Sequence, residues 1–130
     1  MMNGTQAAGR KMKMLVVDDE PDVCDCIRLL LTYEGHEVIS ANSGKAALAE
    51  FENGKFDVVV TDYFMPGMKG DELAAVIKLR SPGQPVMMIS GFAPDRDRLS
   101  AVDFLLSKPF GLEDLREAIS RIANNRANDA

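Results

Sequence analysis

Three aspartates, a serine and a lysine occupy positions from which their side chains could form one charged pocket. Asp18 and Asp19 follow the apolar run MLVV, and Asp62 follows the run VVVT. Ser90 ends the run VMMIS, and Lys108 follows the run FLLS. Clustered carboxylates repel one another unless a cation lies between them, and hard divalent cations such as Mg²⁺ or Mn²⁺ bind oxygen ligands. Lysine and serine can bind phosphoryl oxygens, so the set predicts a metal site that handles a phosphoryl group.

Asp62 is the candidate for covalent chemistry in this set. An aspartate can act as a nucleophile and carry a phosphoryl group as an acyl phosphate. Phosphoryl transfer otherwise needs little more than positioning and neutralisation of charge. A carboxylate held rigidly at the end of a buried strand meets the need for positioning.

The elements that must position these residues are short apolar runs that alternate with amphipathic segments. We predict strands at 14–19, 36–41, 56–61, 85–90 and 103–107, and helices at 21–34, 44–53, 70–80 and 111–125. Buried strands that alternate with helices predict an α/β protein, a parallel sheet with helices on both faces. Ligands of such sheets bind at the carboxyl ends of the strands. All five candidate residues are therefore expected at one edge of the sheet.

The connection between the fourth and fifth strands is short. Pro94 is tolerated only in the first turn of a helix, so we predict a short fourth helix that begins near it. Leu99 and Val102 are its only obvious apolar anchors. A helix of about two turns depends on packing for its existence. We therefore predict that residues 93–102 are the least stable part of the domain.

Composition indicates one ordinary globular domain. The chain has 130 residues, a formal net charge of −5 and only two cysteines. The acidic balance argues against a nucleic-acid surface, and no apolar run approaches the roughly 20 residues that span a membrane. We expect a cytoplasmic protein with a flexible lead-in at 1–12, a domain at 13–125 and a polar tail at 126–130. His36 is expected on the surface, away from the acidic strand ends.

Four segments resemble the signature segments of the response-regulator receiver domain of two-component signalling. They are LVVDDE, TDYFMPGMKG, MMISG and SKPF, and the resemblance covers roughly residues 13–125. The pattern D-x-x-M-P-x-M-x-G is complete from Asp62 to Gly70. The resemblance implies a flavodoxin-like, doubly wound sheet of five parallel strands in the order 2-1-3-4-5.

The resemblance also implies a role for each site residue. Asp62 would be the phosphoacceptor, Asp19 a direct metal ligand, Asp18 a ligand through water, and the backbone carbonyl of Phe64 a third protein ligand. Ser90 resembles the switch hydroxyl, and Lys108 the phosphate-binding lysine that precedes Pro109 across a cis peptide bond. Leu105 stands where the family usually has an aromatic switch residue, and Phe64 and Phe92 stand at positions that tune the lifetime of the phosphoryl group.

The implied function is phosphorelay signalling rather than metabolic catalysis. The domain would take a phosphoryl group from a sensor histidine kinase or phosphotransfer protein onto Asp62, with Mg²⁺ (or Mn²⁺) as cofactor, and change its surface for an unknown downstream effector. It would catalyse its own phosphotransfer and dephosphorylation, and it would contact neither nucleic acid nor membrane. The sequence leaves open whether it stands alone or is part of a hybrid kinase or larger regulator.

Two other functions fit the residues less well. A haloacid-dehalogenase-like phosphatase also uses a strand-end aspartate and Mg²⁺, but it needs a second aspartate two residues later, where this chain has Phe64. A flavodoxin or dinucleotide binder needs a loop of amides around its phosphate after the first strand. This chain has D-D-E-P there.

Overall fold

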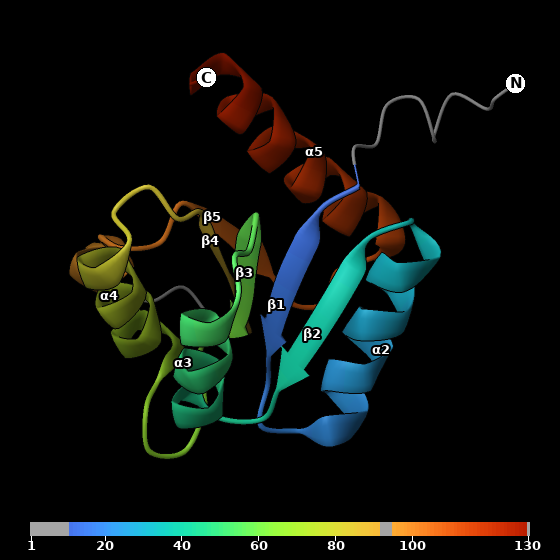
Figure 1. Ribbon diagram of the computed structural model, residues 1–130. Coiled ribbons are helices and arrows are strands. Elements are labelled where there is room, and N and C mark those ends of the chain that lie inside the picture. Colours follow the sequence, from blue (N-terminus) through green and yellow to red (C-terminus); the bar gives the residue numbers. More distant parts are fainter. Residues whose placement is uncertain (1–10, 92–94, 130) are drawn as a thin grey trace, which may run out of the picture.

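The backbone of residues 11–91 and 95–129 is described by a computed structural model. Five strands form one parallel sheet in the order β2-β1-β3-β4-β5 (Figure 1). They are β1 (Lys13–Val17), β2 (Glu37–Ala41), β3 (Val58–Asp62), β4 (Val86–Ser90) and β5 (Phe104–Ser107). The predicted fold class and strand order are confirmed.

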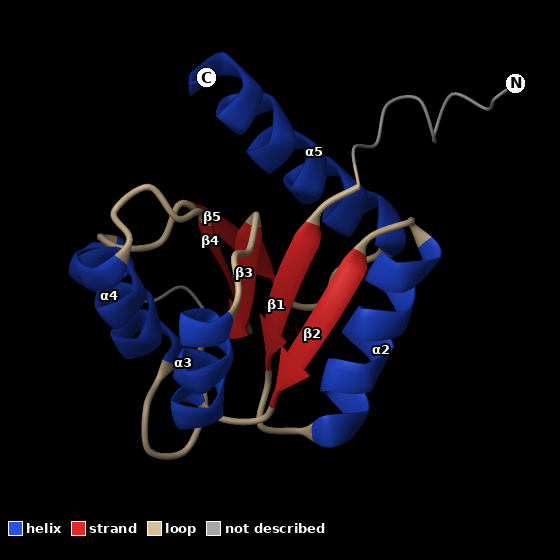
Figure 2. Cartoon of the chain, in the orientation of Figure 1, coloured by secondary structure: helices blue, strands red, loops and turns tan. Residues whose placement is uncertain are grey.

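Helices cover both faces of the sheet. In the described part of the chain they are α2 (Pro21–Tyr33), α3 (Gly44–Asn53), α4 (Gly70–Arg80) and α5 (Leu112–Asp129). Helices α2 and α5 lie on one face, and α3 and α4 on the other (Figure 2). Pro21 occupies the first turn of α2, and the Ser43 hydroxyl accepts a hydrogen bond from the amide of Ala46 to cap α3.

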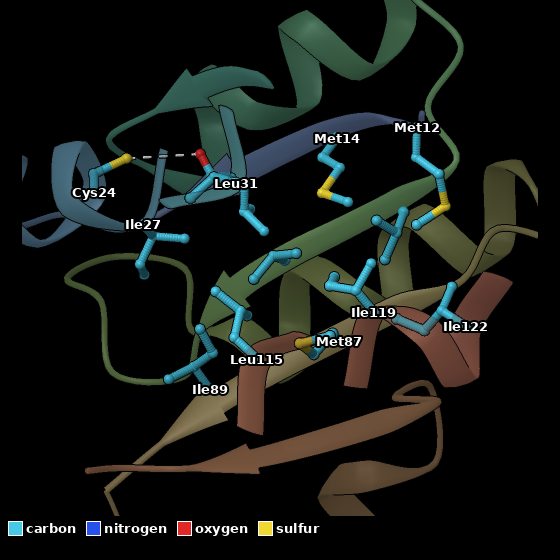
Figure 3. Close-up of a cluster of buried hydrophobic side chains, with 13 residues drawn as sticks. Met12, Met14, Cys24, Ile27, Leu31, Met87, Ile89, Leu115, Ile119 and Ile122 are labelled. Carbon is cyan, nitrogen blue, oxygen red and sulfur yellow. Dashed lines mark hydrogen bonds between the residues drawn. The ribbon is translucent and has the colours of Figure 1, made fainter. Parts of the chain in front are cut away.

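The core has two layers because side chains alternate along each strand. Met14 and Val16 of β1 face α2 and α5, whereas Leu15 and Val17 face α3 and α4. Figure 3 shows the first layer, to which α2 and α5 contribute Cys24, Ile27, Leu31, Leu115, Ile119 and Ile122. A fully buried aliphatic side chain contributes about 1.5–3 kcal/mol, so these layers hold the strand ends rigidly in place.

The connection between β4 and β5 differs from the prediction. Its described part contains a single 3₁₀ turn at Arg96–Leu99 in place of a two-turn α-helix. Leu99 and Val102 are only partly buried, so too little packing is available to support a longer helix. Phe92 lies outside the described residues.

The two ends of the domain also differ from expectation. Met12, which we assigned to the lead-in, is buried, and its amide donates a 3.1 Å hydrogen bond to Nδ1 of His36. His36 is buried too, because β2 pairs with β1 and the amide of Glu37 binds the carbonyl of Met12. The prediction of a surface histidine is therefore wrong. Helix α5 continues to Asp129, since neither glycine nor proline interrupts residues 126–129. None of the described helices is long and apolar enough to cross a membrane.

Candidate functional site

Three carboxylates meet at the carboxyl ends of β1 and β3. These strands are neighbours, with Val17 paired to Thr61, so the residues that follow in each strand lie side by side. One oxygen atom each of Asp18, Asp19 and Asp62 lies within 4.8 Å of the others. Asp18 is 2% exposed and Asp62 8% exposed. The structure thus brings together the acidic residues predicted from the strand ends.

Lys108 supplies the positive charge of this cluster. Its Nζ lies 2.9 Å from Oδ1 of Asp62, and the two side chains are 33% and 10% exposed. Burial by itself lowers the pKa of Lys108, but the hydrogen bond and charge of Asp62 outweigh it, so the pKa is raised. The lysine therefore stays protonated beside Asp62 at neutral pH.

Asp18 has a structural partner as well as a place in the cluster. Its Oδ1 accepts a 2.9 Å hydrogen bond from the amide of Glu20, which begins α2. Burial raises the pKa of Asp18; the Glu20 amide opposes this effect, and the negative charge of Asp62 adds to it. A divalent cation would lower the pKa of Asp18 again, because it would stabilise the charged form of each carboxylate. The oxygen donors and their spacing fit a hard cation.

The neighbouring strands bring the remaining candidates to the same edge. Ser90 ends β4 and is 3% exposed, and its carbonyl accepts a 2.8 Å hydrogen bond from the amide of Lys108. Lys108 follows β5 directly, and the peptide bond between Lys108 and Pro109 is cis. Ser90 and Lys108 are thus joined through the backbone beside the carboxylate cluster.

Two of the predicted tuning and switch residues, Phe64 and Leu105, have exposed side chains. The Phe64 side chain is 68% exposed and packs edge-on against Tyr63. Leu105 is 41% exposed on β5, whereas its neighbour Phe104 is partly buried against the core.

Asn42 belongs to the site and was not predicted. Its side-chain Nδ2 donates a 3.0 Å hydrogen bond to the carbonyl of Asp18. Asn42 follows β2 directly, so the strand-end rule that found the aspartates could have found it.

Residues 14–120 match the family described as "Response regulator receiver domain". The chain belongs to this family. The match covers the whole sheet except Lys13, the first residue of β1, and it includes Asp18, Asp19 and Asp62. Members of this family are signalling modules, so the predicted resemblance is confirmed for the receiver domain described here.

Two similar proteins are longer than this chain. The probable transcriptional regulatory protein TcrX of Mycobacterium tuberculosis is 32% identical over 85% of this chain and 49% of its own length. The virulence sensor protein BvgS of Bordetella bronchiseptica is 35% identical over 89% of this chain and 10% of its own length. The chain therefore spans about half the length of TcrX and about a tenth of the length of BvgS.

Solved structures agree with the fold. A receiver domain from Clostridium thermocellum has a TM-score of 0.83 and 31% identity, over 91% of this chain and 98% of its own. The response regulator TrrA of Thermotoga maritima, crystallised with Mg²⁺ and beryllium fluoride, has a TM-score of 0.80 and 30% identity, over 87% of this chain and 99% of its own.

Proposed function

We propose that Asp62 accepts a phosphoryl group from a sensor histidine kinase or a phosphotransfer protein, in a reaction that requires Mg²⁺ or Mn²⁺. The observation that carries this proposal is the 2.9 Å ion pair between Lys108 and Asp62 inside a cluster of three carboxylates. A buried carboxylate that faces both an ammonium group and a cation site is suited to nucleophilic attack on phosphorus. The magnesium–beryllium fluoride complex of the Thermotoga regulator supports the same chemistry.

The proposed division of roles follows from the positions of the side chains. Asp18, Asp19 and Asp62 would hold the cation, together with the backbone carbonyl of Phe64. When bound, the cation neutralises the carboxylates and the charge on the phosphoryl oxygens. An oxygen of Asp62 would attack phosphorus while the bond from phosphorus to the donor nitrogen breaks, and the nitrogen keeps the electron pair. Lys108 would hold one phosphoryl oxygen.

The switch and the tuning of phosphoryl lifetime are separate parts of the proposal. The Ser90 hydroxyl would bind a further phosphoryl oxygen, and Leu105 would occupy the switch position on β5. Phe64 and Phe92 would set how easily water reaches the acyl phosphate. The exposed ring of Phe64 lies within two residues of Asp62, which supports this role for it.

The proposed setting is signal transduction in the cytoplasm, with an output partner yet to be identified. Cys24 and Cys26 are both free thiols, which suits a reducing compartment. TcrX is named as a transcriptional regulatory protein and BvgS as a virulence sensor protein. Similar domains therefore occur in relatives with different named roles, and we propose no direct contact of this domain with DNA.

Labelling with a small phosphodonor tests the proposal. Acetyl phosphate and Mg²⁺ should add one phosphoryl group to the intact protein, measured by mass spectrometry. Asp62→Asn should lose the label, because an amide is a poor nucleophile. The control Asp97→Asn changes an exposed carboxylate in the 3₁₀ turn and should label as the unaltered protein does. Equal labelling of Asp62→Asn would overturn the assignment.

A further inference from the structure

Asn42 is bound to the peptide unit that joins two of the three clustered aspartates. Its Nδ2 lies 3.0 Å from the carbonyl oxygen of Asp18, 24 residues earlier in the chain. That carbonyl belongs to the peptide bond between Asp18 and Asp19. The hydrogen bond therefore acts on the orientation of the backbone from which the Asp19 side chain projects.

Asp18 and Asp19 are held in different ways. The amide of Asp18 donates a 3.1 Å hydrogen bond to the carbonyl of Ala41, and Oδ1 of Asp18 accepts from the amide of Glu20. Among the residues that the structure describes, none forms a hydrogen bond or ion pair with the Asp19 carboxylate. The direction of the Asp19 side chain consequently depends on its backbone.

The Asn42 hydrogen bond restrains the carbonyl group of Asp18, which the strand pairing does not hold. The Asp18 amide is fixed by β2, and the Asp18 carbonyl, which points to the β2–α3 connection, is fixed by Asn42. Without Asn42 the Asp18–Asp19 peptide could rotate, and the Asp19 oxygen would leave the 4.8 Å cluster for part of the time. Ligand groups held in advance bind a cation more tightly because less freedom is lost on binding.

We propose that Asn42 is a positioning residue for divalent cation binding, acting through the Asp18–Asp19 peptide on Asp19. The inference rests on the proposed function in that it takes Asp19 as a cation ligand. Asn42 is not one of the three clustered carboxylate residues, and its described contact with them is the hydrogen bond to the Asp18 carbonyl. Its effect should therefore appear in the affinity for the cation and disappear once the site is saturated.

The test compares Asn42→Ala with Ser43→Ala, its neighbour in the same connection. Ser43 caps α3 through the Ala46 amide and makes no described contact with Asp18, so its replacement loosens the connection without releasing the peptide. Titration calorimetry with Mg²⁺ should show binding about 10-fold weaker for Asn42→Ala, at the low end of the usual range for residues that support a metal ligand, and unchanged for Ser43→Ala. Labelling by acetyl phosphate should be slower for Asn42→Ala at low Mg²⁺ and equal to the unaltered rate at saturating Mg²⁺.

The outcomes separate this inference from the proposed function. If the unaltered protein does not bind Mg²⁺, the proposed function fails before Asn42 is considered. If it binds Mg²⁺ and Asn42→Ala binds equally well, the positioning role is overturned. Equal weakening by Asn42→Ala and Ser43→Ala would also overturn it, because loosening of the connection would then explain the effect. A labelling rate that stays low at saturating Mg²⁺ contradicts an effect on affinity alone.

Discussion

The guanidinium group of Arg98 lies 3.4 Å from the hydroxyl group of Tyr63. Arg98 belongs to the 3₁₀ turn between β4 and β5, and Tyr63 directly follows the candidate phosphoacceptor Asp62. The same guanidinium lies 3.7 Å from the carboxylate of Asp71 at the start of α4. This side chain is 53% exposed, so its contacts contribute little to global stability. They join the β4–β5 connection to the loop beside the acidic cluster.

Hydrogen exchange should find the β4–β5 connection to be the least stable part of the domain. The amides of residues 95–102 should exchange fast in the free protein, because the described turn holds them by few local hydrogen bonds. Beryllium fluoride, a phosphoryl mimic, should slow them as the segment becomes ordered. Strong protection before activation that is unchanged after it would rule this mechanism out.

Arg98→Ala should speed exchange in the same segment further, because the link to Tyr63 is lost. Arg121→Ala removes another exposed arginine ion pair, on α5, and serves as the control. Exchange in β1 should be unaltered in both variants. The idea of a specific link fails if the two variants have the same effect on residues 95–102.

Magnesium should stabilise the folded protein through the three carboxylates. At a concentration ten times the dissociation constant, the gain is about 1.4 kcal/mol, or about 5 °C in melting temperature for a chain of this length. Asp19→Ala should abolish this response. It should also raise the melting temperature of the metal-free protein, since it removes one of three mutually repelling groups. Differential scanning calorimetry with and without Mg²⁺ measures both effects.

Asp18→Ala provides the contrast. It removes the acceptor of the Glu20 amide as well as a carboxylate. Without metal, the melting temperature of Asp18→Ala should therefore lie below that of Asp19→Ala. A protein whose melting temperature is indifferent to Mg²⁺ would count against the site.

His36 should make the fold sensitive to mild acid. Burial lowers its pKa below the ordinary 6.5, against the opposing charges of Glu34 and Asp57. The unfolded chain therefore binds the proton first, and stability is lost as pH falls from about 6.5 towards the folded pKa, by at most about 1.4 kcal/mol per pH unit. Above pH 7 the effect is absent. Protonation of Nδ1 would also remove the acceptor of the Met12 amide.

His36→Asn isolates this effect, because its side-chain oxygen can still accept from Met12 but does not titrate in this range. Urea unfolding at pH 7.5 and pH 5.5 should show a smaller loss of stability for His36→Asn than for the unaltered protein. Equal losses would assign the acid sensitivity to other groups.

Gly70 permits a close approach that a side chain would prevent. Its amide donates a 2.8 Å hydrogen bond to the carbonyl of Tyr63. An added Cβ would collide with the carbonyl oxygen of Asp62 and lie 2.9 Å from Cα of Tyr63. Gly70→Ala should destabilise the protein by about 1–3 kcal/mol and slow labelling by displacing the end of β3. Gly83→Ala meets no atom within 4 Å and should be neutral or slightly stabilising, as chemical unfolding can show.

The sequence by itself determined the elements and the acidic residues at their ends. Apolar runs such as MLVV and VVVT are buried on both faces, and that pattern is local, so it can be recognised without knowledge of neighbours. Parallel pairing then brings all carboxyl ends to one edge. The place of Asp18, Asp19 and Asp62 in one cluster therefore followed from the chain alone.

Only the tertiary structure decided which distant groups support that cluster. The contact of Asn42 with Asp18 joins residues 24 positions apart, and that of Arg98 with Tyr63 joins residues 35 apart. Such contacts depend on strand register and on the path of a connection, and neither leaves a local pattern. His36 is buried for the same reason, because it lies against Met12, 24 residues earlier in the chain, whose amide donates a hydrogen bond to its ring. The single 3₁₀ turn between β4 and β5, in place of the predicted helix, was likewise decided by packing, because the few apolar residues of that segment are only partly buried.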